Sequence, residues 1–400
     1  MSFLRTFFMA EVFRTLAFLL GGMQALILHW LWVVVLGHPV PPWPIALGIL
    51  VLLVAANVAS YAPLRRARRR EGAIGAVARS YMTVGVATLL LGMAVVALWA
   101  FALPTRLLLG AVGIAPQTQW EWLQLGGNSA LLVAAGVILW GTTLGQSRYD
   151  RTNIRLPLAG LDPSLSGLRI VQLSDLHIGN KMEGERLERL VEDVNAMQPD
   201  LLVLTGDLFD FDPAFVEAGA RELSQLRARL GVFAVLGNHD MYTGATLVAE
   251  GLAAHAPAIR LLRKESVRLP TEAPLYLAGI DDPGRLWTDP ELILDELEEL
   301  GMRLPEDGPT ILLSHRPDAV TQAARLGFAA VLAGHTHGGQ IALPGMAARV
   351  NLARLISRYP RGLFRVGETS LYVNRGAGVA GPAIRIAASR EIATLELTSA

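Results

Sequence analysis

The chain has 400 residues, more than a typical single domain, so at least two structural parts are expected. Hydrophobic residues make up 52% of the chain and charged residues only 18%, which is too apolar for an ordinary soluble protein. No cysteine is present, which excludes disulfide frameworks and thiolate metal sites, so any metal must be held by nitrogen and oxygen ligands.

The formal net charge of the chain is zero because a basic part and an acidic part balance. Residues 1–148 contain ten Arg against three Glu, whereas residues 149–400 contain 25 Lys and Arg against 32 Asp and Glu. We therefore expect a basic transmembrane region over 1–148 and an acidic globular domain over 149–400. An acidic surface repels the phosphate backbone, so nucleic acid is not an expected partner.

The N-terminal part contains four stretches without Asp, Glu, Lys or Arg. Each approaches or exceeds the ~20 residues that a helix needs to cross a bilayer, and they cover roughly residues 15–37, 43–64, 80–105 and 129–147. A cleavable signal peptide is not expected, because the first stretch is too long and three more follow. Only His29 is ionisable within the four stretches, which favours an anchor over a transporter.

The distribution of arginine predicts how the spans are oriented. Residues 65–80 contain six Arg, whereas the expected loops 38–42 and 106–128 together contain only Arg106. The positive-inside rule then places the N-terminus, the Arg-rich loop and residues 149–400 in the cytoplasm of a multi-pass inner (cell) membrane protein. An odd number of spans would reverse this orientation. The Arg-rich loop also suits lipid headgroups or nucleic acid, but a topology signal is the favoured interpretation.

From about residue 166, short apolar strands alternate with amphipathic helices, which indicates an α/β layered domain. A Pro at position 290 directly after Asp289 predicts the start of one of these helices. Polar residues stand where five successive strands end: Asp175 and His177, Asp207, Asn238 and His239, His315, and His335 and His337.

In α/β sheets the carboxyl ends of the strands carry the functional site. An Asp after one strand is often only a turn former and a single His is usually structural, but five such strand ends in order predict a metal site. Carboxylate, amide and imidazole ligands suit borderline divalent or trivalent metals. One aspartate can bridge two such ions about 4 Å apart, a spacing used for in-line attack at phosphorus.

The ordered motifs D-x-H (175–177), G-D (206–207), G-N-H-D (237–240), a lone His (315) and G-H-x-H (334–337) resemble those of the calcineurin-like metallophosphoesterases. This resemblance covers essentially residues 165–400. The phrases "SDLHIG", "AGHTHGGQIALPG" and "YVNRGAG" are similar to the bacterial membrane-associated branch of that superfamily. The resemblance implies an α/β (α+β) four-layer sandwich of two mixed sheets flanked by helices.

The resemblance also implies roles for individual residues. Two divalent or trivalent ions (Mn, Fe or Zn) are expected, the first held by Asp175, His177, Asp207 and His337, and the second by Asp207, Asn238, His315 and His335. His239 is expected to face the phosphate and assist the leaving oxygen, with Asp240 orienting its ring. Arg316 and Arg375 suit phosphate clamps and surface ion pairs equally well.

These features predict a membrane-anchored dimetal phosphohydrolase that cleaves a phosphomonoester, phosphodiester or pyrophosphate by attack of a metal-bridging hydroxide. Four spans exceed what tethering needs, so a lipid-linked substrate at the cytoplasmic surface is a candidate. The superfamily includes UDP-2,3-diacylglucosamine pyrophosphohydrolases, but no residue here indicates recognition of uridine or acyl chains. The alternative is a non-catalytic membrane sensor or scaffold, which the complete ligand set argues against. The oligomeric state is not indicated.

Overall fold

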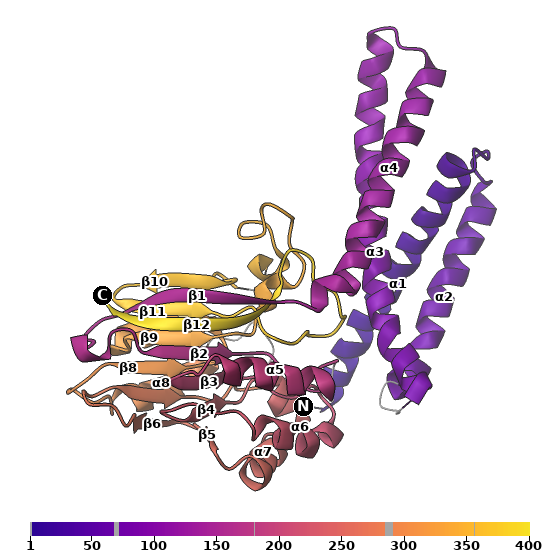
Figure 1. Ribbon diagram of the computed structural model, residues 1–400. Coiled ribbons are helices and arrows are strands. Elements are labelled where there is room, and N and C mark those ends of the chain that lie inside the picture. Colours follow the sequence, from indigo (N-terminus) through magenta and orange to yellow (C-terminus); the bar gives the residue numbers. More distant parts are fainter. Residues whose placement is uncertain (1, 68–71, 180, 285–290, 356) are drawn as a thin grey trace. The chain divides into compact units, whose positions relative to one another are not determined.

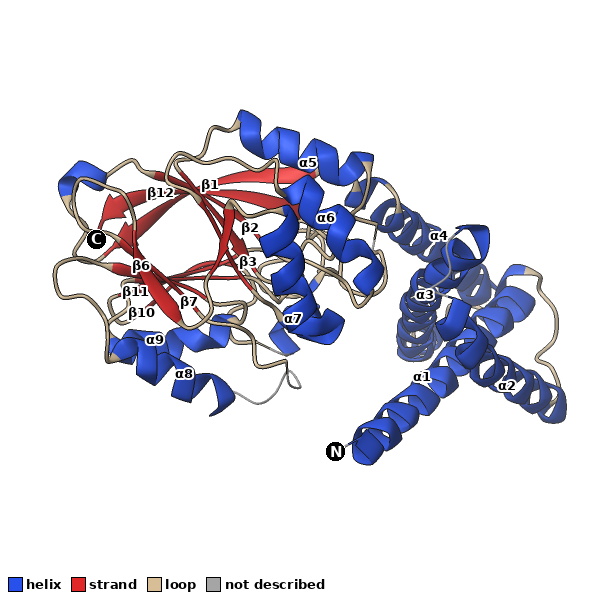
Figure 2. Ribbon diagram, turned by 90° about the horizontal axis from the view of Figure 1, so that it is seen from below, coloured by secondary structure: helices blue, strands red, loops and turns tan. Residues whose placement is uncertain are grey.

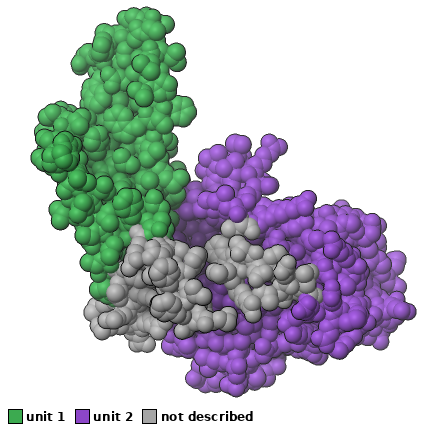
Figure 3. Space-filling model, turned by 180° about the vertical axis from the view of Figure 1, so that it is seen from behind, with its two compact units in different colours: residues 1–142 green, residues 143–400 purple. Residues whose placement is uncertain are grey.

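The computed structural model describes residues 2–67, 72–179, 181–284, 291–355 and 357–400 (Figure 1). The chain divides into two compact units, Met1–Thr142 and Thr143–Ala400 (Figure 3). The first strand, β1, begins only at Tyr149, where the predicted globular domain begins. Two predicted features lie outside the described residues, namely the centre of the Arg-rich loop (68–70) and the helix start at Asp289-Pro290.

The first unit consists of four long apolar helices, as predicted. They are α1 (Ser2–Trp30), extended by a π-helical turn (Leu31–Val35), α2 (Trp43–Ala67), α3 (Gly72–Ala111) and α4 (Pro116–Thr142). Each contains a segment long and apolar enough to cross a membrane: Thr15–Val35, Trp43–Ser60, Thr83–Ala111 and Pro116–Gln146.

The limits of the third and fourth helices differ from the prediction. Most of the expected loop 106–128 is helical, and only residues 112–115 connect α3 to α4. Apolar Leu107, Leu108 and Leu109 prolong α3, and Pro116 occupies the first position of α4, where a proline is tolerated. Arg106 and Glu121 therefore lie within helices, so His29 is not the only ionisable residue of this unit's helices.

Polar side chains also connect the helices of this unit. The Asn57 amide donates to Gln24 (2.9 Å), and the Tyr81 hydroxyl donates to the Asn57 carbonyl oxygen (2.9 Å). The Trp30 indole donates to Asn128 (3.0 Å). Such hydrogen bonds contribute to helix association in an apolar environment, where the hydrophobic effect does not act between helices.

The second unit contains two six-stranded mixed sheets. The first has the order β1 (Tyr149–Leu158), β12 (Arg390–Ser399), β2 (Arg169–Leu173), β3 (Leu201–Thr205), β4 (Val232–Val235) and β5 (Ile259–Leu261). The second has the order β10 (Gly362–Val366), β11 (Thr369–Val373), β9 (Ala330–Ala333), β8 (Thr310–Leu313), β7 (Tyr276–Gly279) and β6 (Glu265–Arg268). Antiparallel pairs are β12–β2, β10–β11 and β6–β7.

Helices cover the outer face of each sheet, which gives the predicted four layers (Figure 2). The first sheet packs against α5 (Glu185–Ala196), α6 (Val216–Leu223) and α7 (Asn238–His255), and the second against α8 (Glu291–Gly301) and α9 (Val320–Leu326). Strand side chains alternate between layers. Leu202 and Leu204 of β3 face the helices, whereas Leu201 and Val203 belong to the core between the sheets.

The topology determines where the loops of interest lie. Strands β2, β3 and β4 run parallel in one sheet, and β8 and β9 run parallel in the other. The carboxyl ends of neighbouring parallel strands lie at one edge of each sheet. Residues that follow these five strands can therefore meet across the two sheets.

Candidate metal centre

The five strand ends converge, and their buried or nearly buried polar side chains form two neighbouring clusters; a third group, His177, Asp210 and His239, overlaps the first at His177. Asp175 and His177 follow β2, and Asp207 follows β3. Asn238 and His239 open α7 after β4, while His315 follows β8, and His335 and His337 follow β9. Every residue predicted as a metal ligand is thus brought to this region.

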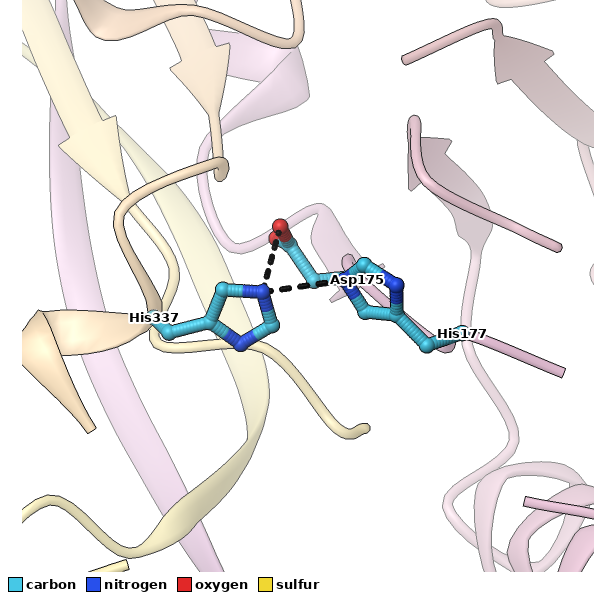
Figure 4. Close-up of side chains that lie close together, drawn as sticks. All are labelled: Asp175, His177 and His337. Atoms are coloured by element: carbon cyan, nitrogen blue, oxygen red, sulfur yellow. Dashed lines mark hydrogen bonds and ion pairs between the residues drawn. The ribbon is translucent and has the colours of Figure 1, made fainter. Parts of the chain in front are cut away.

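The first cluster joins Asp175, His177 and His337 from two different sheets (Figure 4). The Nε2 atoms of the two imidazoles lie 3.0 Å apart. His337 Nε2 lies 3.3 Å from Asp175 Oδ1. Two imidazole nitrogens and one carboxylate oxygen that face one another are a suitable ligand set for a transition metal.

The second cluster joins Asp207, His315 and His335. His315 Nε2 lies 3.2 Å from Asp207 Oδ2 and 3.2 Å from His335 Nδ1. The same Asp207 oxygen lies 3.6 Å from Nε2 of His177, which belongs to the first cluster. Asp207 therefore lies between the two clusters, as a ligand shared by two ions must.

Asn238 adds an amide oxygen that has no protein partner. Its Oδ1 atom is buried and accepts no hydrogen bond from any described residue. An unsatisfied buried acceptor costs about 1–3 kcal/mol, so such atoms are rare in native proteins. A cation would satisfy this oxygen, and the residues present therefore fit a metal centre.

The backbone at this centre is held in an unusual conformation. Five of the seven predicted ligands have positive φ angles between 50° and 69°, a region that non-glycine residues rarely occupy: Asp175, His177, Asp207, His335 and His337. Such strain persists where the surrounding structure over-determines it, often at functional sites.

One close contact locks the loop after β9 onto the loop after β2. The His335 amide donates to both carboxylate oxygens of Asp175, at 3.0 and 3.1 Å. A Cβ atom on Gly334 would overlap Ser174 Oγ and Asp175 Oδ2, so this approach requires a glycine. The two loops that supply the first cluster are thereby held at a fixed separation.

Burial and charge set the protonation of the ligands. Burial lowers the pKa of His335 and His337 well below the usual value, which favours the neutral imidazole that binds metals. Burial would also lower the pKa of His315, but Asp207 outweighs it and raises that pKa to about 10. Metal binding at His315 would therefore be coupled to release of a proton.

Asp210, and not Asp240, contacts the ring of His239. Asp210 Oδ1 lies 2.8 Å from His239 Nδ1 and 3.3 Å from His177 Nδ1. Burial would raise the pKa of Asp210, but the hydrogen bonds with these two histidines lower it below the usual range. An ionised carboxylate at this position orients one predicted ligand and the predicted acid together.

The predicted role of Asp240 is wrong. Its carboxylate accepts hydrogen bonds from the backbone amides of Leu208 (3.1 Å), Phe209 (2.9 Å) and Gly237 (2.9 Å). Asp240 therefore caps the N-terminus of α7 and fixes the loop after β3. Asp210 has no distinguishing signal in the sequence beyond its place three residues after Asp207 in "GDLFD".

An aromatic side chain borders His239 at the surface. The Phe211 ring is 47% exposed, although its backbone has a φ of 53°. Its centroid lies 4.4 Å from that of His239 and 5.6 Å from that of Tyr242, to which it is nearly parallel. Phe211 therefore provides an apolar surface next to the predicted proton donor.

The two candidate phosphate clamps form ion pairs within the protein. Buried Arg316 donates from Nε to Asp282 Oδ2 (2.6 Å) and from Nη2 to Asp282 Oδ1 (3.2 Å). Arg375 pairs with Asp150 (3.0 Å) and with Glu391 (3.3 Å). Both arginines thus form ion pairs, but the pair of Arg316 is buried and not at the surface.

Arg385 is a further residue that sequence reasoning missed. It is almost fully buried, and burial lowers its pKa to about 9. Its guanidinium donates to the carbonyls of Arg375 (2.9 Å) and Gly378 (2.7 Å), and Nη2 lies 3.2 Å from His337 Nδ1. Arg385 thus holds the 375–378 loop beside His337.

Comparison with known proteins identifies the family. Residues 168–339 match the family model described as calcineurin-like phosphoesterase. A zebrafish transmembrane protein with a metallophosphoesterase domain is 35% identical over 282 residues, which cover 68% of this chain and 62% of the relative. An uncharacterized metallophosphoesterase of Campylobacter jejuni is 31% identical, with coverage of 75% and 76%. One of Bacillus subtilis is 30% identical, with coverage of 67% and 94%.

Solved structures are more distant. A zebrafish dimetal phosphatase is 14% identical and has a TM-score of 0.33, with coverage of 53% of this chain and 88% of that one. A 5'-nucleotidase precursor of Thermus thermophilus is 16% identical with a TM-score of 0.36, and the coverage is 57% and 54%. The aligned region spans about three fifths of the zebrafish membrane relative, whereas it spans nearly all of the Bacillus one. By sequence, the chain belongs to the calcineurin-like metallophosphoesterases, a family of metal-dependent phosphoester hydrolases.

Proposed function

We propose that this protein is a membrane-anchored phosphohydrolase that uses two metal ions at the paired clusters. The observation that carries the proposal is the position of Asp207, whose Oδ2 atom lies 3.2 Å from a ligand of one cluster and 3.6 Å from a ligand of the other. Asp175, His177 and His337 complete the first site, and Asn238, His315 and His335 the second. Two bound cations supply charge neutralisation of the phosphate and a water activated for attack at phosphorus.

His239 is the group proposed to assist the leaving oxygen. Its Nδ1 atom is engaged by Asp210 at 2.8 Å, which leaves Nε2 as the atom that exchanges a proton with the substrate. The ionised Asp210 fixes the orientation of the ring. Phe211 borders this ring, so the leaving group passes next to an apolar surface.

The four apolar helices support a reaction at a membrane surface, and we propose a substrate in or near the lipid headgroup layer. The excess of Arg at 65–80 and after residue 147 supports a cytoplasmic globular unit. The inner membrane is then the expected location. A lipid-linked phosphate or pyrophosphate satisfies both the chemistry of the site and the anchoring.

Activity of the detergent-solubilised full chain tests this function. With Mn²⁺ added, we expect turnover of one class among phosphomonoesters, phosphodiesters and lipid pyrophosphates, with Asp207→Asn as the inactive control. Binding of two metals without turnover of any substrate class would favour the sensor or scaffold instead. Turnover that survives in Asp207→Asn would overturn the assignment of the site.

A further inference from the structure

Residues 343–355, named here the 343–355 loop, expose an unusual number of large apolar side chains. Leu343 is 49% exposed, Met346 47%, Val350 46%, Leu352 50% and Leu355 81%. Among the described residues of 143–400, these five make up half of the large apolar side chains that are exposed. Large apolar side chains exposed together on one short segment indicate a candidate interaction surface.

The loop is ordered by its own hydrogen bonds. The Leu343 amide donates to the Val350 carbonyl (2.9 Å), the Leu352 amide to Ile341 (3.2 Å), and the Asn351 side chain to Ala347 (2.9 Å). The backbone is therefore satisfied internally while the apolar side chains remain outside. A loop that merely lacked structure would not present them in this way.

The charge of the loop differs from that of the domain around it. The segment contains Arg349 and Arg354 and no acidic residue, whereas residues 149–400 carry an excess of Asp and Glu. Both arginines are exposed, and neither forms an ion pair with a described residue. The Arg354 guanidinium donates to the neutral Ala348 carbonyl of the same loop (3.3 Å), which leaves its charge uncompensated. Exposed leucines together with arginines outside ion pairs are typical of segments that bind anionic lipid surfaces.

The loop is attached directly to the candidate metal centre. Gly339, two residues after His337, has a φ of +85°, and a Cβ atom there would lie 2.8 Å from the amide nitrogens of both Leu352 and Ala353. The Ala342 amide also donates to Ile386 (2.9 Å). The exposed apolar side chains thus lie on the segment that continues from a metal ligand.

We propose that the 343–355 loop docks on an anionic bilayer surface, with its leucines in the interfacial layer and Arg349 and Arg354 at the headgroup phosphates. The chain's own apolar helices keep its globular unit close to a membrane, so a bilayer surface is within reach of the loop. The consequence, that the metal centre is supplied with headgroup phosphates, rests on the function proposed above. The docking itself does not.

A fluorescent probe tests the docking. Because the chain has no cysteine, Leu355→Cys can be labelled uniquely with a nitrobenzoxadiazole dye in the full-length protein, in nanodiscs that hold one copy. With phosphatidylglycerol present we expect blue-shifted emission and quenching by spin-labelled lipids. The control is Glu368→Cys, at the exposed turn between β10 and β11. Strand β11 runs parallel to β9, so this turn lies beside the start of β9, whereas the loop with His335 and His337 follows the end of β9. Its emission should stay water-like and unquenched.

Two outcomes would overturn the proposal. Emission from Leu355→Cys that matches the Glu368→Cys control would mean that the loop stays in water. A blue shift without quenching by the spin-labelled lipids would mean that the loop packs against protein, either a partner or the chain's own helices.

The charges and the chemistry are tested separately. Arg349→Gln with Arg354→Gln, in the labelled Leu355→Cys background, should remove the difference between discs with and without phosphatidylglycerol. An unchanged difference would overturn the role of the two arginines. Adding Asp207→Asn should leave the emission and quenching as they were, so a failed docking test and a failed phosphohydrolase assay are distinguishable.

Discussion

The carboxylate of Asp210 lies 2.8 Å from Nδ1 of His239, and this contact couples the predicted proton donor to the metal centre. The same oxygen lies 3.3 Å from His177 Nδ1, on the far side of that ring from the cluster formed by Nε2. One buried carboxylate therefore orients both a metal ligand and a proton donor. Changes at Asp210 are expected to affect proton transfer more than folding.

Asp210→Asn should lower kcat by about 10- to 100-fold, the range for partners that orient catalytic and metal-binding side chains. The loss should shrink for a nitrophenyl ester, because a good leaving group needs less protonation. The kcat and the pH profile of both substrate types, measured side by side, check this. An equal loss on both substrates would contradict a positioning role through His239.

Asp240→Asn is the matched comparison, because Asp240 holds three backbone amides and does not contact the ring. An amide cannot accept all three hydrogen bonds, so we expect a loss of roughly 1–3 kcal/mol in the free energy of unfolding. Calorimetric melting of the full chain measures it. If kcat depended on the leaving group in Asp240→Asn and not in Asp210→Asn, Asp240 would be the residue that orients the His239 ring.

Asp207→Asn should abolish hydrolysis and reduce the bound metal below two ions per chain, because both clusters lose their shared anionic ligand. Metal content by mass spectrometry gives a readout that does not depend on substrate. Asp193→Asn, in an exposed ion pair with Arg151, is the control and should keep both metal and turnover. Two bound ions and normal turnover in Asp207→Asn would refute the site.

The convergence of the predicted ligands could be expected because it follows from topology, whereas their roles as ligands rest on the family resemblance. A parallel strand delivers its next residues to one edge of the sheet, so Asp207 and His315 could be placed from the strands that precede them. The prediction that Asp240 orients the His239 ring is wrong for a physical reason. Both lie in the first turn of α7, and successive side chains of a helix do not face each other.

Other features depend on contacts that local sequence does not specify. Arg385 lies 48 residues from His337 in the chain, and only the folded loops bring them together. The exposure of Leu352 and Leu355 likewise could not be read from their apolar character, which by itself predicts burial. The limits of α3 and α4 differ from the prediction because Arg106 ends an uncharged stretch of sequence, whereas a helix can continue through such a residue near an interface.

His239→Ala should leave both metals bound while kcat falls by roughly 10²–10⁴, the range for general acid–base groups. His239 donates no ligand atom to either paired cluster in the proposed assignment. Metal analysis beside kinetics on alkyl and nitrophenyl esters checks this, and the alkyl ester should suffer more. Loss of one ion in this variant would show that His239 is a ligand.

The stability of the globular unit should fall at acidic pH through Glu391. Burial would raise the pKa of Glu391, but Arg375 and the hydrogen bonds from Thr152 and Tyr372 lower it below the usual value. A group with a lowered folded-state pKa stabilises the protein above its unfolded pKa of about 4.3, and this contribution is lost as the pH falls through the folded value.

Glu391→Gln should therefore lower the melting temperature at pH 7 and flatten its decline toward low pH. Calorimetric melting of the wild type and the variant across this range provides the measurement. Glu368→Gln is a suitable control because its ion pair with Arg365 is exposed, and exposed pairs contribute little. A decline in Glu391→Gln as steep as that of the wild type would assign the acid sensitivity to other groups.

The orientation of the membrane helices is the remaining prediction, and it depends on an even number of spans. The structure has four helices long enough to cross, and the connections 36–42 and 112–115 contain no Lys or Arg. The Arg-rich segment between the second and third helices should therefore stay inside, together with the N-terminus and the globular unit.

Green fluorescent protein fused after residue 400 should fluoresce, and alkaline phosphatase fused there should be inactive. Alkaline phosphatase inserted within 38–42 is the control and should be active. Strong phosphatase activity from the fusion after residue 400 would reverse the orientation and place the substrate on the outer face. It would leave the metal centre, and the docking of the 343–355 loop on a lipid surface, unchanged.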